Sequence, residues 1–260
     1  MGHIRLGRLG TSPSWQALLA QLDLAAVDVR AVAITTADGA QLRLIGMRND
    51  PVLGYCVWLL SRIATAARSD DFIGETRHLG LAVGPGETMV SLIAQVNDLV
   101  IREINRYPAS GPFGQIAATS VKRTLLETIA VMQPVLLGSS VDDLTAVIRR
   151  QTTDRAFGSL AVLFFGDLLA RTLRFYVDKE LPLHIGAGSG VRTIEMSRLF
   201  LQDLDQYSRQ SARIVETFAT EWLSKYDFLE HRYISREQAQ GFAAYALQKL
   251  DGELRVEVAA

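Results

Sequence analysis

Apolar residues recur every three to four positions through most of the second half of the chain, the spacing of a helix that buries one face. The clearest stripe lies between residues 87 and 106 and consists of Met89, Ile93, Val96, Val100 and Ile104. Similar patterns predict further helices over about 113–132, 140–150, 154–180, 191–225 and 235–250. We therefore expect residues 86–260 to form a helical bundle.

Two of these predicted helices carry more apolar surface than a monomer needs. The segment 191–225 keeps near-heptad spacing from Ile194 to Trp222 and would make a helix about 50 Å long. The segment 156–177 is apolar on nearly every side, apart from a stripe at i, i+4, i+7 and i+11 where opposite charges can pair. That stripe consists of Asp167, Arg171, Arg174 and Asp178. One interpretation is a central core helix, and the other is packing against another subunit.

The first 85 residues show a different pattern, rich in β-branched residues and turn signals. Val29–Thr36 and Gln41–Met47 flank Asp38-Gly39, which predicts a β-hairpin at 29–47. Short strands are predicted at 3–7 and 78–84, and helices are predicted to begin at Ser12-Pro13 and Asp50-Pro51. The order βαββαβ indicates a ferredoxin-like sheet.

The predicted fold class is therefore α+β and predominantly α-helical. A small N-terminal sheet within residues 1–85 is followed by a C-terminal helical bundle at 86–260, with one continuous domain as the alternative.

Composition narrows the function classes. The chain has 260 residues, 48% hydrophobic and 21% charged, with a formal net charge of -1, which excludes a disordered chain and a generic nucleic-acid binder. Its single cysteine, Cys56, excludes an internal disulfide, and four histidines do not complete a structural zinc spacing. We predict no catalytic residue, no metal and no cofactor. The absence of a targeting segment or long apolar stretch predicts a cytoplasmic protein without a membrane partner.

One string carries candidate chemistry. LHIGAGSGVRT, residues 183–193, resembles the glycine-rich first motif of Rossmann-type S-adenosylmethionine-dependent methyltransferases, with Gly186, Gly188 and Gly190 at its three glycine positions. In that family the loop approaches the cofactor, and a carboxylate ending the next strand holds the ribose. Here a long predicted helix follows instead, and a parallel sheet does not fit in the residues that remain, so no family is assigned.

The same loop has a more general interpretation. It precedes a long predicted helix, so its free N–H groups and the helix dipole can hold an anion. The candidate ligand-binding residues are His184, Gly186, Gly188, Gly190, Arg192 and Thr193. The competing interpretation is that the glycines let the chain reverse between two helices.

These observations predict a non-catalytic interaction or assembly protein, a subunit of a homo-oligomer or a larger complex. We expect it to self-associate, or to bind a protein partner, through the helix at 191–225. One alternative is a ligand-binding protein or enzyme that uses the loop 183–193 for an anionic or nucleotide ligand. Another is a nucleic-acid-associated subunit, which is not favoured because the predicted hairpin has no stacking aromatics.

Overall fold

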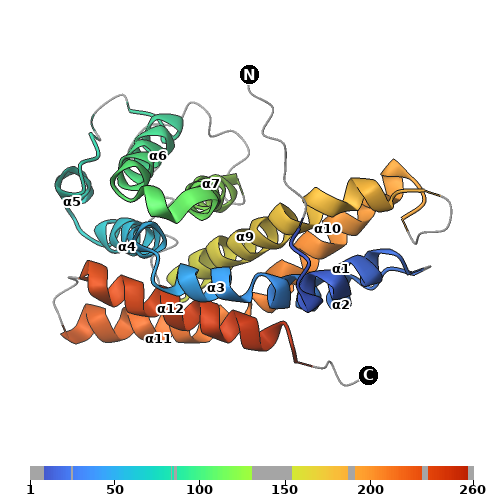
Figure 1. Ribbon diagram of the computed structural model, residues 1–260. Helices are drawn as coiled ribbons and strands as arrows, with labels where there is room; N and C mark the ends of the chain where they lie inside the picture. The colour runs from blue at the N-terminus through green and yellow to red at the C-terminus, as the bar shows by residue number, and fades with distance from the viewer. Residues whose placement is uncertain are drawn as a thin grey trace.

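The computed structural model describes residues 9–24, 26–82, 84, 87–130, 154–186, 191–229 and 234–256, and every named element in them is helical (Figure 1). The only β-type pairing among these residues is an isolated bridge between Ile185 and Val191. The α-helices are α1 (Pro13–Leu22), α2 (Val29–Gly39), α3 (Gln41–Arg48), α4 (Pro51–Ala66), α5 (Phe72–His78), α6 (Met89–Arg106), α7 (Gly111–Ala130), α9 (Asp154–Glu180), α10 (Ile194–Ser211), α11 (Ile214–Leu229) and α12 (Arg236–Glu253). Two short 3-10 turns are η1 (Pro108–Ser110) and η3 (Leu181–His184).

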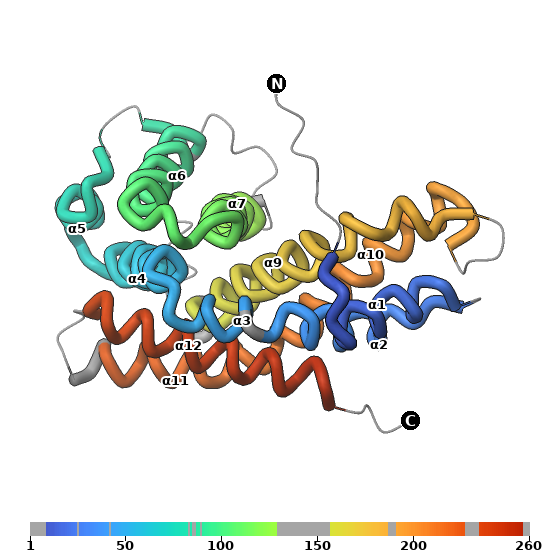
Figure 2. Tube along the Cα trace, in the orientation of Figure 1, coloured from blue at the N-terminus to red at the C-terminus, as the bar shows by residue number. Residues whose placement is uncertain are grey.

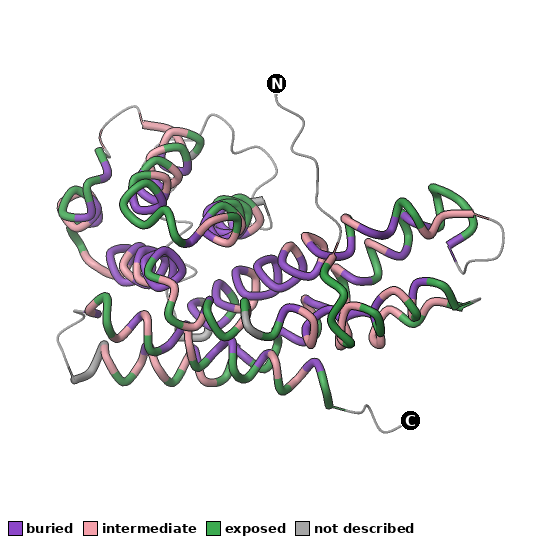
Figure 3. Tube along the Cα trace, viewed as in Figure 1, coloured by how far each residue is buried: buried purple, intermediate pink, exposed green. Residues whose placement is uncertain are grey.

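Helix α9 is the centre of the molecule. Its side chains are buried over most of its length (Figure 3), and Phe164, Leu168 and Leu173 are almost completely excluded from solvent. Helices α10 and α11 pack along it, and α7, α2 and α4 contact it as well. The prediction of a helix over 154–180 is confirmed, and its apolar character follows from neighbours on nearly every side.

The predicted N-terminal sheet is wrong, because the segment expected to form a hairpin is two helices, α2 and α3. Val32, Ala33, Thr36 and Ala37 are buried, which is the spacing of one helical face. Asp28 caps the first turn of α2 by accepting a hydrogen bond from the amide of Arg30. Residues 31–34 are apolar in succession, so both helical and strand periods fit this part of the sequence.

Gly39 explains why the β-turn predicted at Asp38-Gly39 is wrong. Its backbone does not have a positive φ, so it does not form the tight turn expected of Asp38-Gly39. A Cβ at this position would instead overlap the indole ring of Trp15 from α1. The glycine therefore allows α1 and α2 to approach each other closely, which is a packing role.

Neither of the two outer strands predicted for the sheet is confirmed. Residue His78 ends α5, and Leu79 and Gly80 form the turn that follows, so the strand expected at 78–84 is absent from the described part of that segment. The strand expected at 3–7 and the helix expected at 140–150 lie outside the described residues.

The predicted helix starts at Asp50-Pro51 and at residue 235 are confirmed, and both helices are capped. The Asp50 carboxylate accepts hydrogen bonds from the amides of Val52 and Leu53 at the start of α4. Ser235 and Gln238 form a capping box at the start of α12. The helix predicted to begin at Ser12-Pro13 is α1, but the Ser12 side chain forms no capping hydrogen bond. These short-range signals were reliable because a cap and its helix are neighbours in sequence.

The continuous helix predicted over 191–225 is wrong, because the chain breaks between α10 and α11 at residues 212 and 213. Ala212 is completely buried, and its Cβ lies 3.4 Å from the position that a Cβ on Gly166 of α9 would occupy. The break lets the two helices follow α9, with α10 against its C-terminal half and α11 against its N-terminal half (Figure 1). Ser211 and Ala212 are compatible with a helix, so the sequence carries no stop signal there.

Helices from both sides of residue 85 contribute to one hydrophobic cluster. The last helix, α12, packs against α3 and α4, and its contacts join segments far apart in sequence (Figure 2). The indole Nε1 of Trp58 donates to the carbonyl of Ile234 at 2.9 Å, and Nε2 of Gln240 donates to the carbonyl of Arg48 at 2.8 Å. Among the described residues, no helix is both long enough and apolar enough to cross a membrane.

Candidate functional site

The loop predicted to bind a ligand joins η3 to α10, and two of its candidate residues have partners within the chain. Nδ1 of His184 lies 2.6 Å from Oδ1 of Asp23, which follows α1. Thr193 caps α10 by accepting a hydrogen bond from the amide of Met196 at 3.1 Å. The side chain of Arg192 is exposed to solvent. The structure thus places His184, Arg192 and Thr193 at one end of the molecule, and anion binding by them stays a prediction.

The glycines of this loop are only partly described. Gly186 has a φ of 154° and donates its N–H to the carbonyl of Val191 at 3.1 Å, beside the bridge between Ile185 and Val191. These contacts hold the two ends of the loop together. Gly188 and Gly190 lie outside the described residues.

The same end of the molecule exposes apolar side chains. Ile194, the first residue of α10, is 80% exposed, and Leu183 of η3 is 61% exposed. The His184–Asp23 contact brings the end of α1 beside η3, so the exposed side chains come from three neighbouring segments. We call this set the apolar end, and it consists of Leu24, Leu183, Ile194, Met196 and Leu199.

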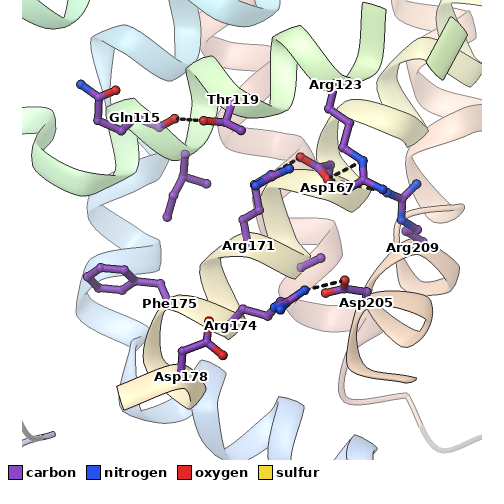
Figure 4. Close-up of a pocket in the computed structure, with 12 residues that line it drawn as sticks. Gln115, Thr119, Arg123, Asp167, Arg171, Arg174, Phe175, Asp178, Asp205 and Arg209 are labelled. Carbon is purple, nitrogen blue, oxygen red and sulfur yellow. Dashed lines mark hydrogen bonds and ion pairs between the residues drawn. The ribbon is translucent and has the colours of Figure 1, made fainter. Parts of the chain in front are cut away.

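A second feature is an arginine-lined groove between α7, α9 and α10, shown in Figure 4. At its base lies the Asp167 carboxylate, whose side chain is only 4% exposed. Its Oδ2 accepts hydrogen bonds from the Ser120 hydroxyl at 2.9 Å and from Nε of Arg171 at 2.5 Å. Its Oδ1 lies 3.4 Å from Nε of Arg123 and 3.6 Å from Nη2 of Arg209. A buried carboxylate with this many donors joins three helices.

Glu127 extends the network along α7. It accepts hydrogen bonds from Nε of Arg123 at 2.6 Å and from both terminal nitrogens of Arg209, at 3.0 and 3.2 Å. Burial alone would raise the pKa of the Glu127 carboxyl, but the hydrogen bonds from Arg209 and Arg123 outweigh it and lower the pKa below its ordinary value. Glu127 is therefore held in its charged form.

The other end of the groove holds Arg174, Asp178 and Asp205. Nη1 of Arg174 donates to Oδ2 of Asp205 at 3.0 Å, which ties α9 to α10. Oδ1 of Asp205 is buried and accepts no hydrogen bond from the described residues. Burial raises the pKa of the Asp178 carboxyl, an effect that Arg174 opposes and Asp205 reinforces.

The lowered pKa of Glu127 leads to a prediction about acid stability. A carboxyl whose pKa is lower in the folded state stabilises the fold above its ordinary pKa, and this contribution is lost as the pH falls through the lowered pKa. We expect the difference in unfolding free energy between the wild type and Glu127→Gln to shrink as the pH falls from about 5 to about 3. Urea titrations of both proteins at several pH values would measure this difference in unfolding free energy.

The control for this experiment is Glu221→Gln on α11, where the side chain is exposed to solvent. Its effect on stability should be small at every pH. A Glu127→Gln difference that stays constant across this pH range would contradict the prediction.

The charge stripe on α9 was visible in the sequence, but its partners were not. The i,i+4 pair of Asp167 and Arg171 is present as the spacing predicted. Ser120 lies 47 residues before Asp167 in the sequence, and Arg209 lies 42 residues after it. The apolar periodicity of each helix does not indicate which distant helices pack together. Only the folded chain shows that their side chains converge.

Other candidate chemistry is limited to local observations. Cys56 is fully buried on α4, and its burial strongly raises the pKa of the thiol. No group of three or more potential metal ligands occurs in the part of the chain that the structure describes. Comparison of the chain with protein-family models, with curated proteins and with solved structures finds no significant match.

Proposed function

We propose that this chain is a non-catalytic assembly protein that associates with a second copy of itself through the apolar end. The observation that carries the proposal is the exposure of Ile194 and Leu183 at the same end of the molecule as three further exposed apolar side chains. Single exposed apolar residues are ordinary on protein surfaces, but a group from adjacent segments is typical of an interaction site. Association would remove this surface from water.

The charges beside the apolar end favour self-association over a different partner. Glu195 and Arg198 form an ion pair at 2.6 Å on the first turns of α10, and both side chains are well exposed. If two copies pair about a two-fold axis with their α10 helices antiparallel, Glu195 of each copy would lie opposite Arg198 of the other. In this arrangement the surface would be complementary to itself, as a two-fold interface requires.

Size-exclusion chromatography with light scattering tests the proposal. We expect the wild type to elute as a dimer and the double variant Ile194→Asp, Leu199→Asp to shift toward the monomer, with dimer affinity reduced by tenfold or more. Both side chains are exposed, so the variant should keep its helical circular dichroism.

The control is Val90→Asp, an exposed apolar position on α6, away from α10 (Figure 1). It should leave the dimer intact. A wild type that is monomeric at about 100 μM, or a dimer that both variants weaken equally, would overturn the proposal. An absorbance at 260 nm that is lost in high salt would favour the nucleic-acid alternative instead.

A further inference from the structure

The arginine-lined groove has the size of a small-molecule site. Its volume is about 440 Å³, within the ~300–1,000 Å³ typical of ligand pockets. Four arginines line it, and a neighbouring hollow of about 400 Å³ shares two of them together with Asp205. The four are Arg123, Arg171, Arg174 and Arg209.

All four of these arginines are held in place by carboxylates, and Glu127 binds both Arg123 and Arg209. Asp167 binds Nε of Arg171, and Asp205 binds Nη1 of Arg174. Arg171 and Arg174 are three residues apart on α9, so their side chains leave the same face of the helix. Figure 4 shows both lying along the groove between α7 and α10. Guanidinium groups that are already oriented lose less entropy when a ligand binds.

Donors remain on both side chains after these contacts. No contact among the described residues uses the two terminal nitrogens of Arg171 or Nη2 of Arg174. Terminal nitrogens of this kind bind planar or tetrahedral oxyanions through paired hydrogen bonds. A carboxylate has two oxygens and matches one guanidinium, whereas a phosphate has three and can engage both.

Three apolar side chains also line the groove: Ile116 of α7, and Ala170 and Phe175 of α9. The Phe175 ring packs edge-on against Phe113 at a centroid distance of 5.9 Å, which fixes its orientation. We propose that the groove binds a small organic phosphate, whose phosphate contacts Arg171 and Arg174 and whose apolar part lies against Phe175. This site is separate from the apolar end, so a result that contradicts the proposed assembly would not contradict ligand binding in the groove.

Isothermal titration calorimetry with phenyl phosphate tests this site on the full chain. We expect saturable binding, with inorganic phosphate weaker because it lacks the ring, and with benzoate weaker by about tenfold because it engages one guanidinium fewer. The absence of saturable heat up to about 10 mM phenyl phosphate would overturn the proposal.

Substitutions of the lining residues then test which side chains contact the ligand. Arg174→Gln should weaken phenyl phosphate binding by about tenfold, and Phe175→Leu should weaken phenyl phosphate while leaving inorganic phosphate unchanged. Arg171→Lys keeps the charge beside Asp167, which protects the fold, but removes the paired donors and should also weaken binding. Circular dichroism checks that each variant is folded.

The matched control is Arg106→Gln, which removes an arginine of α6 that is 63% exposed and does not line the groove. It should bind phenyl phosphate as the wild type does. Equal losses in Arg174→Gln and Arg106→Gln would mean that general charge attraction causes the binding, and would overturn the proposal.

Discussion

Replacing Phe165 with alanine should lower the free energy of unfolding by about 3–5 kcal/mol. Its side chain is 1% exposed on the central helix α9. The centroid of its ring lies 5.1 Å from the ring centroid of Phe164 and 6.1 Å from that of Phe242 of α12. The substitution removes these contacts and leaves a cavity that the surrounding helices fill only in part. Urea denaturation followed by circular dichroism would report the loss as a lower midpoint.

Leu126→Ala on α7 is the control for a large-to-small substitution at the surface, because Leu126 is 41% exposed. It should change the unfolding free energy by about 0.5 kcal/mol or less. Equal effects of the two substitutions would contradict the position of α9 at the centre of the core.

Gly158→Val should destabilise the protein by about 1–3 kcal/mol, or more, because it forces α9 away from α11. A Cβ at this position would lie 2.5 Å from Oγ1 of Thr220 and 2.9 Å from the backbone carbonyl oxygen of Glu216. A side chain can rotate away, but the backbone of a packed helix moves only with the helix. Thermal and urea denaturation would both measure the effect.

The same substitution at Gly241 of α12 is the matched control. No atom lies within 4 Å of a Cβ there, and valine is a slightly better helix former than glycine. Gly241→Val should therefore be close to neutral. If the two variants were equally stable, the close approach of α9 and α11 would not limit the residue at position 158.

The sequence predicted best those features whose partners are a few residues apart. The capping residues Asp50 and Ser235 stand directly before the helices that they cap, so their roles follow from short spacings. The charge pair of Asp167 and Arg171 is a single turn of one helix. These interactions form without reference to the rest of the fold.

The errors concern features that tertiary packing decides. Gly39 and Gly166 serve close helix approach, against Trp15 and Ala212 respectively, and a glycine in a sequence does not state which neighbour requires it. The β-branched residues of α2 favour strands by propensity, but their burial against α1 and α10 stabilises a helix. Convergence of Arg209 on Asp167 likewise depends on how the helices pair.

The packing of α12 on α3 and α4 has a consequence for synthesis of the chain. The hydrogen bond from Gln240 to Arg48 joins residues 192 positions apart. At the usual pace of translation, α4 leaves the ribosome roughly 10–40 s before the helix that covers Trp58 and Gly54. During that interval the apolar face of α4 lacks its native cover. A nascent chain halted before residue 234 would therefore expose this face, and exposed apolar surface of this kind promotes aggregation and recruits chaperones.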